Sequence, residues 1–74
     1  MYSTMVFERP SIKESVITKE FDLRFVLKNE RTTIYENKDA RFSFDKSVIR
    51  VMIYDGNNRK LTHRVEDYFY NEQE

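Results

Sequence analysis

The sequence has no cysteine and no tryptophan, and its 74 residues include one glycine, one proline and one histidine. Without cysteine the chain has no disulfide framework, no thiolate metal site and no thiol nucleophile. A single glycine excludes a glycine-rich phosphate loop. A metal-free ribonuclease is the best catalytic alternative, but no pattern requires its four candidate side chains to converge: His63, Arg64, Glu66 and Tyr68. We therefore expect a protein that is not an enzyme and that binds no cofactor and no metal ion.

Neither sign of charge dominates, because thirteen Lys and Arg residues balance thirteen Asp and Glu residues. No net field would therefore recruit nucleic acid or an anionic membrane. The chain also lacks a targeting signal and any apolar run near the roughly 18 residues of a membrane span. We expect one domain over 1–74, located in the cytoplasm. Its composition, rich in Asn, Lys, Ile, Tyr and Phe, is typical of compact phage and mobile-element proteins, which would place it in the host cytoplasm.

The strongest pattern in the sequence is an alternation of apolar and polar residues with a period of two. Alternating apolar and polar residues predict strands, because successive side chains of a strand point to opposite faces. The clearest strand is predicted over 21–28, and shorter ones follow over 32–35, 41–45 and 48–54. A further edge strand is predicted over 2–7. The expected fold class is mainly β, with a small α+β fold as the alternative: one antiparallel meander sheet of about five strands with short helical or irregular terminal segments.

The two ends of the chain carry helix signals. Residues 11–14 fit a capping box, which predicts a short helix through about Thr18. The Asp-Gly pair at 55–56 is a strong hairpin signal and predicts a strand over 59–65 that pairs back along 48–54, followed by a helical or loose tail. A competing helical stripe is formed by Leu61, Val65, Tyr68 and Phe69.

The predicted strands place most apolar residues on one face, which is the candidate core: Phe21, Leu23, Phe25, Leu27, Ile34, Phe42, Phe44, Ile49, Val51 and Ile53. The reverse face is not cleanly polar, because it mixes apolar residues with three arginines: Val26, Tyr35, Val48, Met52 and Tyr54, with Arg24, Arg41 and Arg50. A sheet that faces water normally alternates more strictly, so we expect this face to be covered. Cover by Tyr68, Phe69 or the N-terminal strand is favoured over a partner or a second copy.

The last ten residues are acidic and aromatic. They hold four acidic groups and no basic group, which leaves thirteen basic and nine acidic groups in 1–64. Such a tail over 66–74 is suited to a basic protein surface, because its rings supply buried area and its carboxylates steer association. The alternatives are a solvated terminus and a tail folded back on the chain itself. The predicted partner-binding residues are Glu66, Asp67, Tyr68, Phe69 and Tyr70.

These features predict a small non-enzymatic protein-binding module, of the kind that phages use to inhibit or regulate a host protein complex. A symmetric homodimer is also expected, since a small core with a surplus apolar face and an unpaired edge strand gains by pairing. The alternative function is a single-stranded nucleic-acid-binding domain of OB-like or RNA-binding type. Net neutrality argues against it, because affinity for phosphates comes from positive charge. Its candidate residues are Arg24, Tyr35, Arg41, Arg50 and Tyr54.

Overall fold

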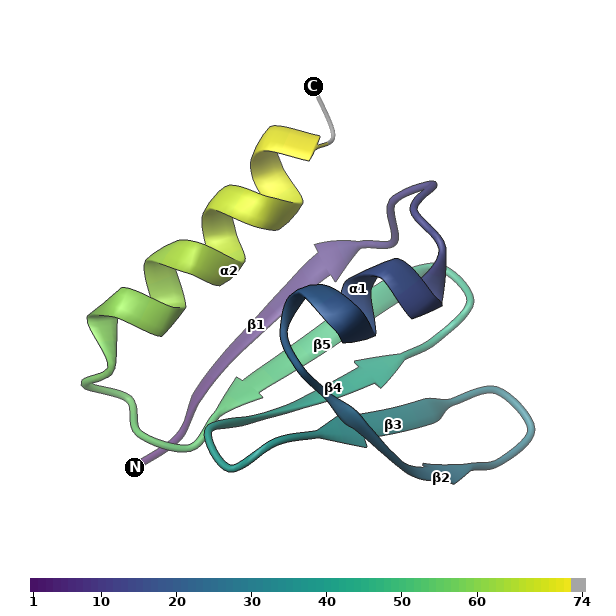
Figure 1. Ribbon diagram of the computed structural model, residues 1–74, viewed down its shortest axis with the longest axis horizontal. Coiled ribbons are helices and arrows are strands. Elements are labelled where there is room, and N and C mark those ends of the chain that lie inside the picture. The colour runs from purple at the N-terminus through teal and green to yellow at the C-terminus, as the bar shows by residue number, and fades with distance from the viewer. Residues whose placement is uncertain (73–74) are drawn as a thin grey trace.

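The computed structural model describes residues 1–72, in which five strands form one antiparallel sheet and two helices pack against it (Figure 1). The elements in chain order are β1 (Ser3–Glu8), α1 (Glu14–Glu20), β2 (Arg24–Lys28), β3 (Thr33–Glu36), β4 (Ala40–Phe44), β5 (Val48–Ile53) and α2 (Arg59–Glu72). The strand order is β1-β5-β4-β3-β2. Strands β2 to β5 therefore form a meander, β1 pairs with β5, and β1 and β2 are the two edges. The predicted fold class is confirmed, and so is an edge strand near the N-terminus.

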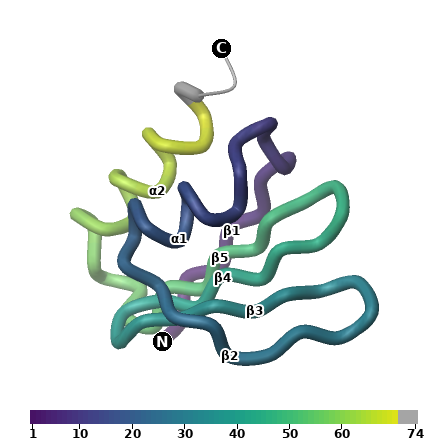
Figure 2. The backbone as a smooth tube through the Cα atoms, turned by 45° about the vertical axis from the view of Figure 1, so that its right-hand side comes forward, coloured from purple at the N-terminus to yellow at the C-terminus, as the bar shows by residue number. Residues whose placement is uncertain are grey.

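Both helices lie on the same side of the sheet (Figure 2). Their buried residues, such as Ile17 of α1 and Phe69 of α2, join one core with the inward side chains of the strands. The fully buried core is Phe7, Ile17, Phe21, Ala40, Phe42, Phe44, Ile49, Val51, Ile53, Val65 and Phe69. The expectation that the chain's own ends cover the reverse face is wrong. Strand β1 lies in the sheet, because it pairs with β5, and Phe69 is buried on the helix side.

The predicted strand over 21–28 begins three residues late, because its first residues end α1. Phe21 is the C-cap residue and donates its N–H to the Ile17 carbonyl. Asp22 follows with a φ of 54°, and Leu23 donates to the Thr18 carbonyl. This pattern is a Schellman motif, in which a left-handed residue reverses the chain and satisfies the last helix carbonyls. Phe21 is still buried, but it reaches the core from the helix.

Helix α1 also begins differently from the prediction. It runs from Glu14 to Glu20, its N-cap residue is Lys13, and no side chain caps it. Glu14 does not complete a capping box with Ser11, because its carboxylate is bonded to Arg9 and Tyr35 instead.

Strand β2 carries a bulge that changes which residues face the core. Phe25 pairs with Tyr35 and Leu27 with Ile34, so the residue between them, Val26, is inserted without a partner. The predicted core positions Phe25 and Leu27 are exposed on this edge strand. The predicted faces are also wrong for two residues of β3. Ile34 lies on the reverse face and Tyr35 on the helix side, because β3 is shifted by one residue relative to the prediction.

The predicted strand over 59–65 is helical in the structure. Helix α2 begins after Asn58, whose side-chain oxygen accepts the Leu61 N–H at 3.1 Å, and the predicted helical stripe packs on the core. The edge of β5 that this strand would have used is taken by β1. The Asp-Gly signal marks a connection rather than a hairpin. Gly56 has no positive φ, and its N–H donates to the Met1 carbonyl at 2.7 Å.

Candidate functional site: the open face of the sheet

The side of the sheet opposite the helices has no covering layer in the described chain. Two rows of cross-strand neighbours make up this surface, which we call the open face. One row is Arg24, Glu36, Arg41, Met52 and Thr4, and the other is Leu27, Ile34, Ser43, Arg50 and Val6. Tyr54 and Asp45 border the two rows. All five strands contribute, and the small Ser43 lies on the central strand β4.

The first row holds a carboxylate shared by two donors. Glu36 Oε1 accepts hydrogen bonds from Arg41 Nη2 at 3.0 Å and from the Tyr54 hydroxyl at 3.2 Å. The bond from Arg41 lowers the pKa of Glu36, and Tyr54 and the nearby charge of Arg24 lower it further. Burial and the bond to Glu36 raise the pKa of Tyr54. At neutral pH this cluster therefore holds an ionised carboxylate and a neutral phenol.

The second row is bordered by a similar pair. Arg50 Nη1 lies 2.6 Å from Asp45 Oδ2, and the other oxygen of Asp45 accepts the hydroxyl of Thr32. Both arginines in the middle of the open face are thus held by carboxylates on neighbouring strands. These pairs fix the two guanidinium groups on the sheet and leave little net positive charge there.

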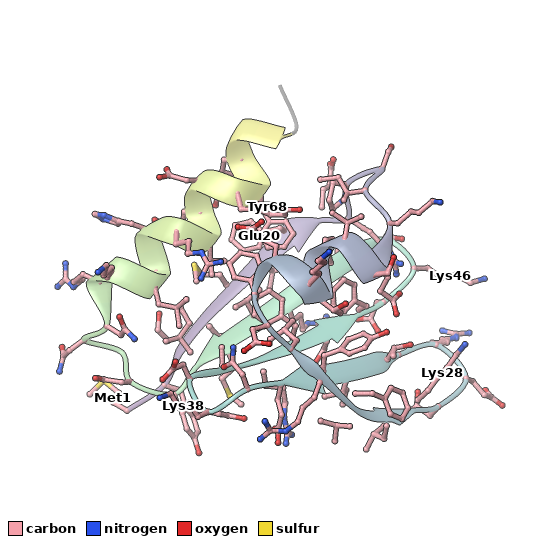
Figure 3. The ribbon with its side chains drawn as sticks, viewed as in Figure 1. Met1, Glu20, Lys28, Lys38, Lys46 and Tyr68 are labelled. Atoms are coloured by element: carbon pink, nitrogen blue, oxygen red, sulfur yellow. The ribbon has the colours of Figure 1, made fainter. Side chains whose placement is uncertain are left out.

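The composition of the open face differs from that of the remaining surface. It carries three arginines but none of the chain's lysines. Lys28 lies on the helix side by its register with Thr33, and Figure 3 shows Lys38 at one end of the strands and Lys46 at the other. Apolar side chains fill the space between the charged pairs, and Val6 (54%) and Leu27 (43%) are well exposed. Arg, Met and Tyr are enriched in protein interfaces whereas Lys is depleted.

The predicted tail residues do not form one accessible surface. Phe69 is fully buried and stacks on Phe7, with ring centroids 4.9 Å apart. Tyr68 is half-buried and packs edge-on against Phe21. Tyr70 is 55% exposed, Asp67 is exposed and Glu66 is half-buried. The part of the tail up to residue 72 belongs to α2, and residues 73–74 lie outside the described residues.

The predicted nucleic-acid residues are only partly brought together. Arg24, Arg41 and Arg50 lie on the open face, and Tyr54 borders it. Tyr35 lies on the helix side, where its hydroxyl donates to Glu14. Burial, together with this bond, raises the pKa of Tyr35 to about 12.

Sequence reasoning missed three apolar residues of the open face, because it placed Leu27 and Ile34 in the core and did not assign Val6 to a face. The bulge in β2 and the register of β3 determine the first two positions, and no local pattern indicates either. For Val6 a signal was available, since alternation with the buried Phe7 places Val6 on the opposite face.

No catalytic or metal site stands out within residues 1–72. His63 is exposed, while Arg64 pairs with Glu20 and lies 4.7 Å above the Phe21 ring. No group of three or more His, Cys, Asp or Glu side chains in this part of the chain could hold a metal ion, and neither of its helices is long and apolar enough to cross a membrane. Comparisons with protein-family models, curated proteins and solved structures find no match. The candidate site therefore depends on the geometry of the open face itself.

Proposed function

We propose that this protein is a non-enzymatic protein-binding module whose contact surface is the open face. The observation that carries the proposal is an uncovered five-stranded face with carboxylate-held arginines, intervening apolar side chains and no lysine. A face that only meets water would favour lysine, whose strongly hydrated ammonium resists burial. Arginine and methionine instead suit a surface that is desolvated against another protein.

The size of the open face is that of a small contact surface. Five strands about 4.8 Å apart and four to six residues long form a surface of roughly 300–400 Å², below the roughly 800 Å² per partner of a standard interface and closer to that of a weak or transient one. The carboxylate-held pairs give the face both signs of charge, which favours a partner with matching polar groups over a uniformly charged one.

Single-stranded nucleic acid is the less favoured partner. Arg41 and Arg50 would have to exchange their carboxylates for phosphates, and Tyr35, one of the two aromatic residues predicted for this function, is on the other side of the sheet. Inhibition of a host complex by a phage-type protein, and a cytoplasmic location, stay predictions.

The test compares two matched substitutions in the tagged full-length chain. Ile34→Lys places a charge in the middle of the open face, and Val16→Lys places the same charge on the exposed side of α1. Both variants are checked for native circular dichroism and then used, with the wild type, to capture partners from host lysate with and without nuclease. We expect a nuclease-resistant protein that the wild type and Val16→Lys retain and Ile34→Lys loses.

Two results would overturn the proposal. A partner retained by Ile34→Lys would place the contact elsewhere on the molecule, and loss of that partner in Tyr70→Ala would point to the exposed part of α2. Recovery of nucleic acid, with binding lost in the joint Arg24→Gln, Arg41→Gln and Arg50→Gln variant, would favour the nucleic-acid function.

A further inference from the structure

The backbone of β1 has hydrogen-bonding groups that point away from the sheet. Arg9 donates its N–H to the Ser47 carbonyl at 2.9 Å, which continues the register of β1 with β5. Because antiparallel strands bond through alternate residues, Phe7 and Met5 also bond to β5, whereas Thr4 and Val6 direct their N–H and C=O groups outwards. No hydrogen bond found outside the regular elements of residues 1–72 involves the backbone of Thr4 or Val6.

The two edges of the sheet are protected to different degrees. Edge strands normally avoid further pairing by bulges, by charged side chains and by being short. Strand β2 has a bulge, and its first and last residues, Arg24 and Lys28, are charged. Strand β1 is longer, pairs with β5 in an unbroken register and has no charged side chain before Glu8. Its exposed Val6 adds an apolar side chain beside the free backbone groups. By these criteria, β1 is the edge that remains able to pair.

We propose that a second copy of this chain pairs with β1 in antiparallel fashion, about a two-fold axis at Val6. Val6 then lies opposite Val6 of the second copy, and Thr4 lies opposite Glu8 of the second copy. This register lets the outward-directed backbone N–H and C=O groups of the two strands form hydrogen bonds with each other. It also keeps each side chain on its own face, because opposed residues differ by an even number of positions. This inference goes beyond the proposed function and does not depend on it.

The residues of β1 are compatible with pairing to a second copy of the same strand, whereas those of β2 are not. A two-fold axis at Val6 opposes no two groups of like charge along β1. The equivalent arrangement about Val26 of β2 would oppose Arg24 and Lys28, which lie on different faces of the sheet because of the bulge. It would also oppose Phe25 and Leu27, which lie on different faces for the same reason. Side chains on different faces cannot form cross-strand contacts, whereas about Val6 of β1 the opposed residues share a face.

The dimer has a clear structural consequence for the open face. Pairing through β1 joins two five-stranded sheets into one ten-stranded sheet, and the open faces of the two copies become continuous across the axis. Val6 moves from the margin of the surface to its centre. A partner would therefore meet a surface with two-fold symmetry and twice the width.

The test measures self-association by sedimentation equilibrium, using the full chain at several concentrations. Val6→Lys puts like charges at the axis, and Phe25→Lys is its matched control, since it changes an apolar residue of similar exposure at the opposite edge. We expect the wild type and Phe25→Lys to form dimers of twice 9.1 kDa, with dimerisation of Val6→Lys weakened at least about tenfold. Because the chain has no cysteine, Val6→Cys introduces a unique thiol, which should form a disulfide-linked dimer under mild oxidation.

Three outcomes would overturn the inference. A wild-type chain that remains monomeric at millimolar concentration has no β1 dimer. A dimer that persists in Val6→Lys and dissociates in Phe25→Lys uses the β2 edge. A monomeric wild type whose captured protein partner is lost in Val6→Lys but retained in Ile34→Lys uses the β1 edge for a strand of another protein. The Ile34→Lys variant should leave the dimer intact, so failure of the dimer and failure of the proposed function give different results.

Discussion

Replacing Phe69 by alanine should destabilise the protein severely, although this residue lies in the acidic segment near the C-terminus. Its ring is fully buried, stacks on Phe7 and lies 6.2 Å from the Phe21 ring. Truncating a buried phenylalanine costs about 3–5 kcal/mol, because it removes buried apolar area and leaves a cavity. Small domains have only about 5–15 kcal/mol of total stability. The substitution should therefore lower the melting temperature by at least about 12 °C, at 4–8 °C per kcal/mol for a domain of this size.

The neighbouring Tyr70 provides the control, because it is aromatic, lies in the same helix and is more than half exposed. Its ring contacts Phe7 edge-on, an interaction worth about 0.5–1.5 kcal/mol. Urea unfolding of Phe69→Ala and Tyr70→Ala, followed by circular dichroism, measures both losses. We expect the Phe69 loss to be at least twice the Tyr70 loss. Equal losses, or a Phe69 loss below about 1 kcal/mol, would refute the packing of α2 on the sheet described above.

Three further predictions concern capping and protonation. Asn58→Ala should lower the free energy of unfolding by about 0.5–2 kcal/mol, because it removes the N-cap of α2, whereas Asn57→Ala should have little effect; urea unfolding of both variants tests this. The folded-state pKa of Tyr35, about 12, lies above its ordinary value of 10.0, so Tyr35 contributes stability below pH 10 that is lost between pH 10 and 12. The stability advantage of the wild type over Tyr35→Phe should disappear across that interval, and an advantage that persists at pH 12 would contradict the bond to Glu14. The lowered pKa of Glu36 has the opposite sign, so its contribution is present above pH 4.5 and lost as the pH falls through the folded-state value. The wild type should be more stable than Glu36→Gln at pH 7 and lose this advantage in acid, and a difference independent of pH would contradict the ionised cluster.

The strands of the meander could be predicted from the sequence because each buries one face. Residues such as Phe42, Phe44, Ile49 and Val51 alternate with polar or exposed ones, and that period specifies both the strand and its inward side. The ends of the sheet could not be predicted in this way. The start of β2 depends on the left-handed Asp22, and Phe21 fits the helical and the extended pattern equally well.

The competition for the free edge of β5 also could not be decided locally. Both 2–7 and 59–65 have residues suited to a strand, and the second segment is a helix because Asn58 caps it and Val65 and Phe69 pack against the sheet. The same limit applies to the candidate site. Arg24, Arg41 and Arg50 could be assigned to one face by alternation, but their neutralising carboxylates on adjacent strands depend on the register.

The order of the strands implies an order of folding events. Strands β2 to β5 are joined by short turns and can pair as soon as they meet, whereas β1 must pair with β5 across most of the chain, Ser3 lying opposite Ile53. Closing such a long loop is slow relative to forming adjacent hairpins. During synthesis β1 leaves the ribosome first and stays without its partner until β5 has emerged. The segment with the most pairing-competent edge is therefore also the one that stays unpaired longest, and the nascent chain is most prone to aggregation before β5 is available.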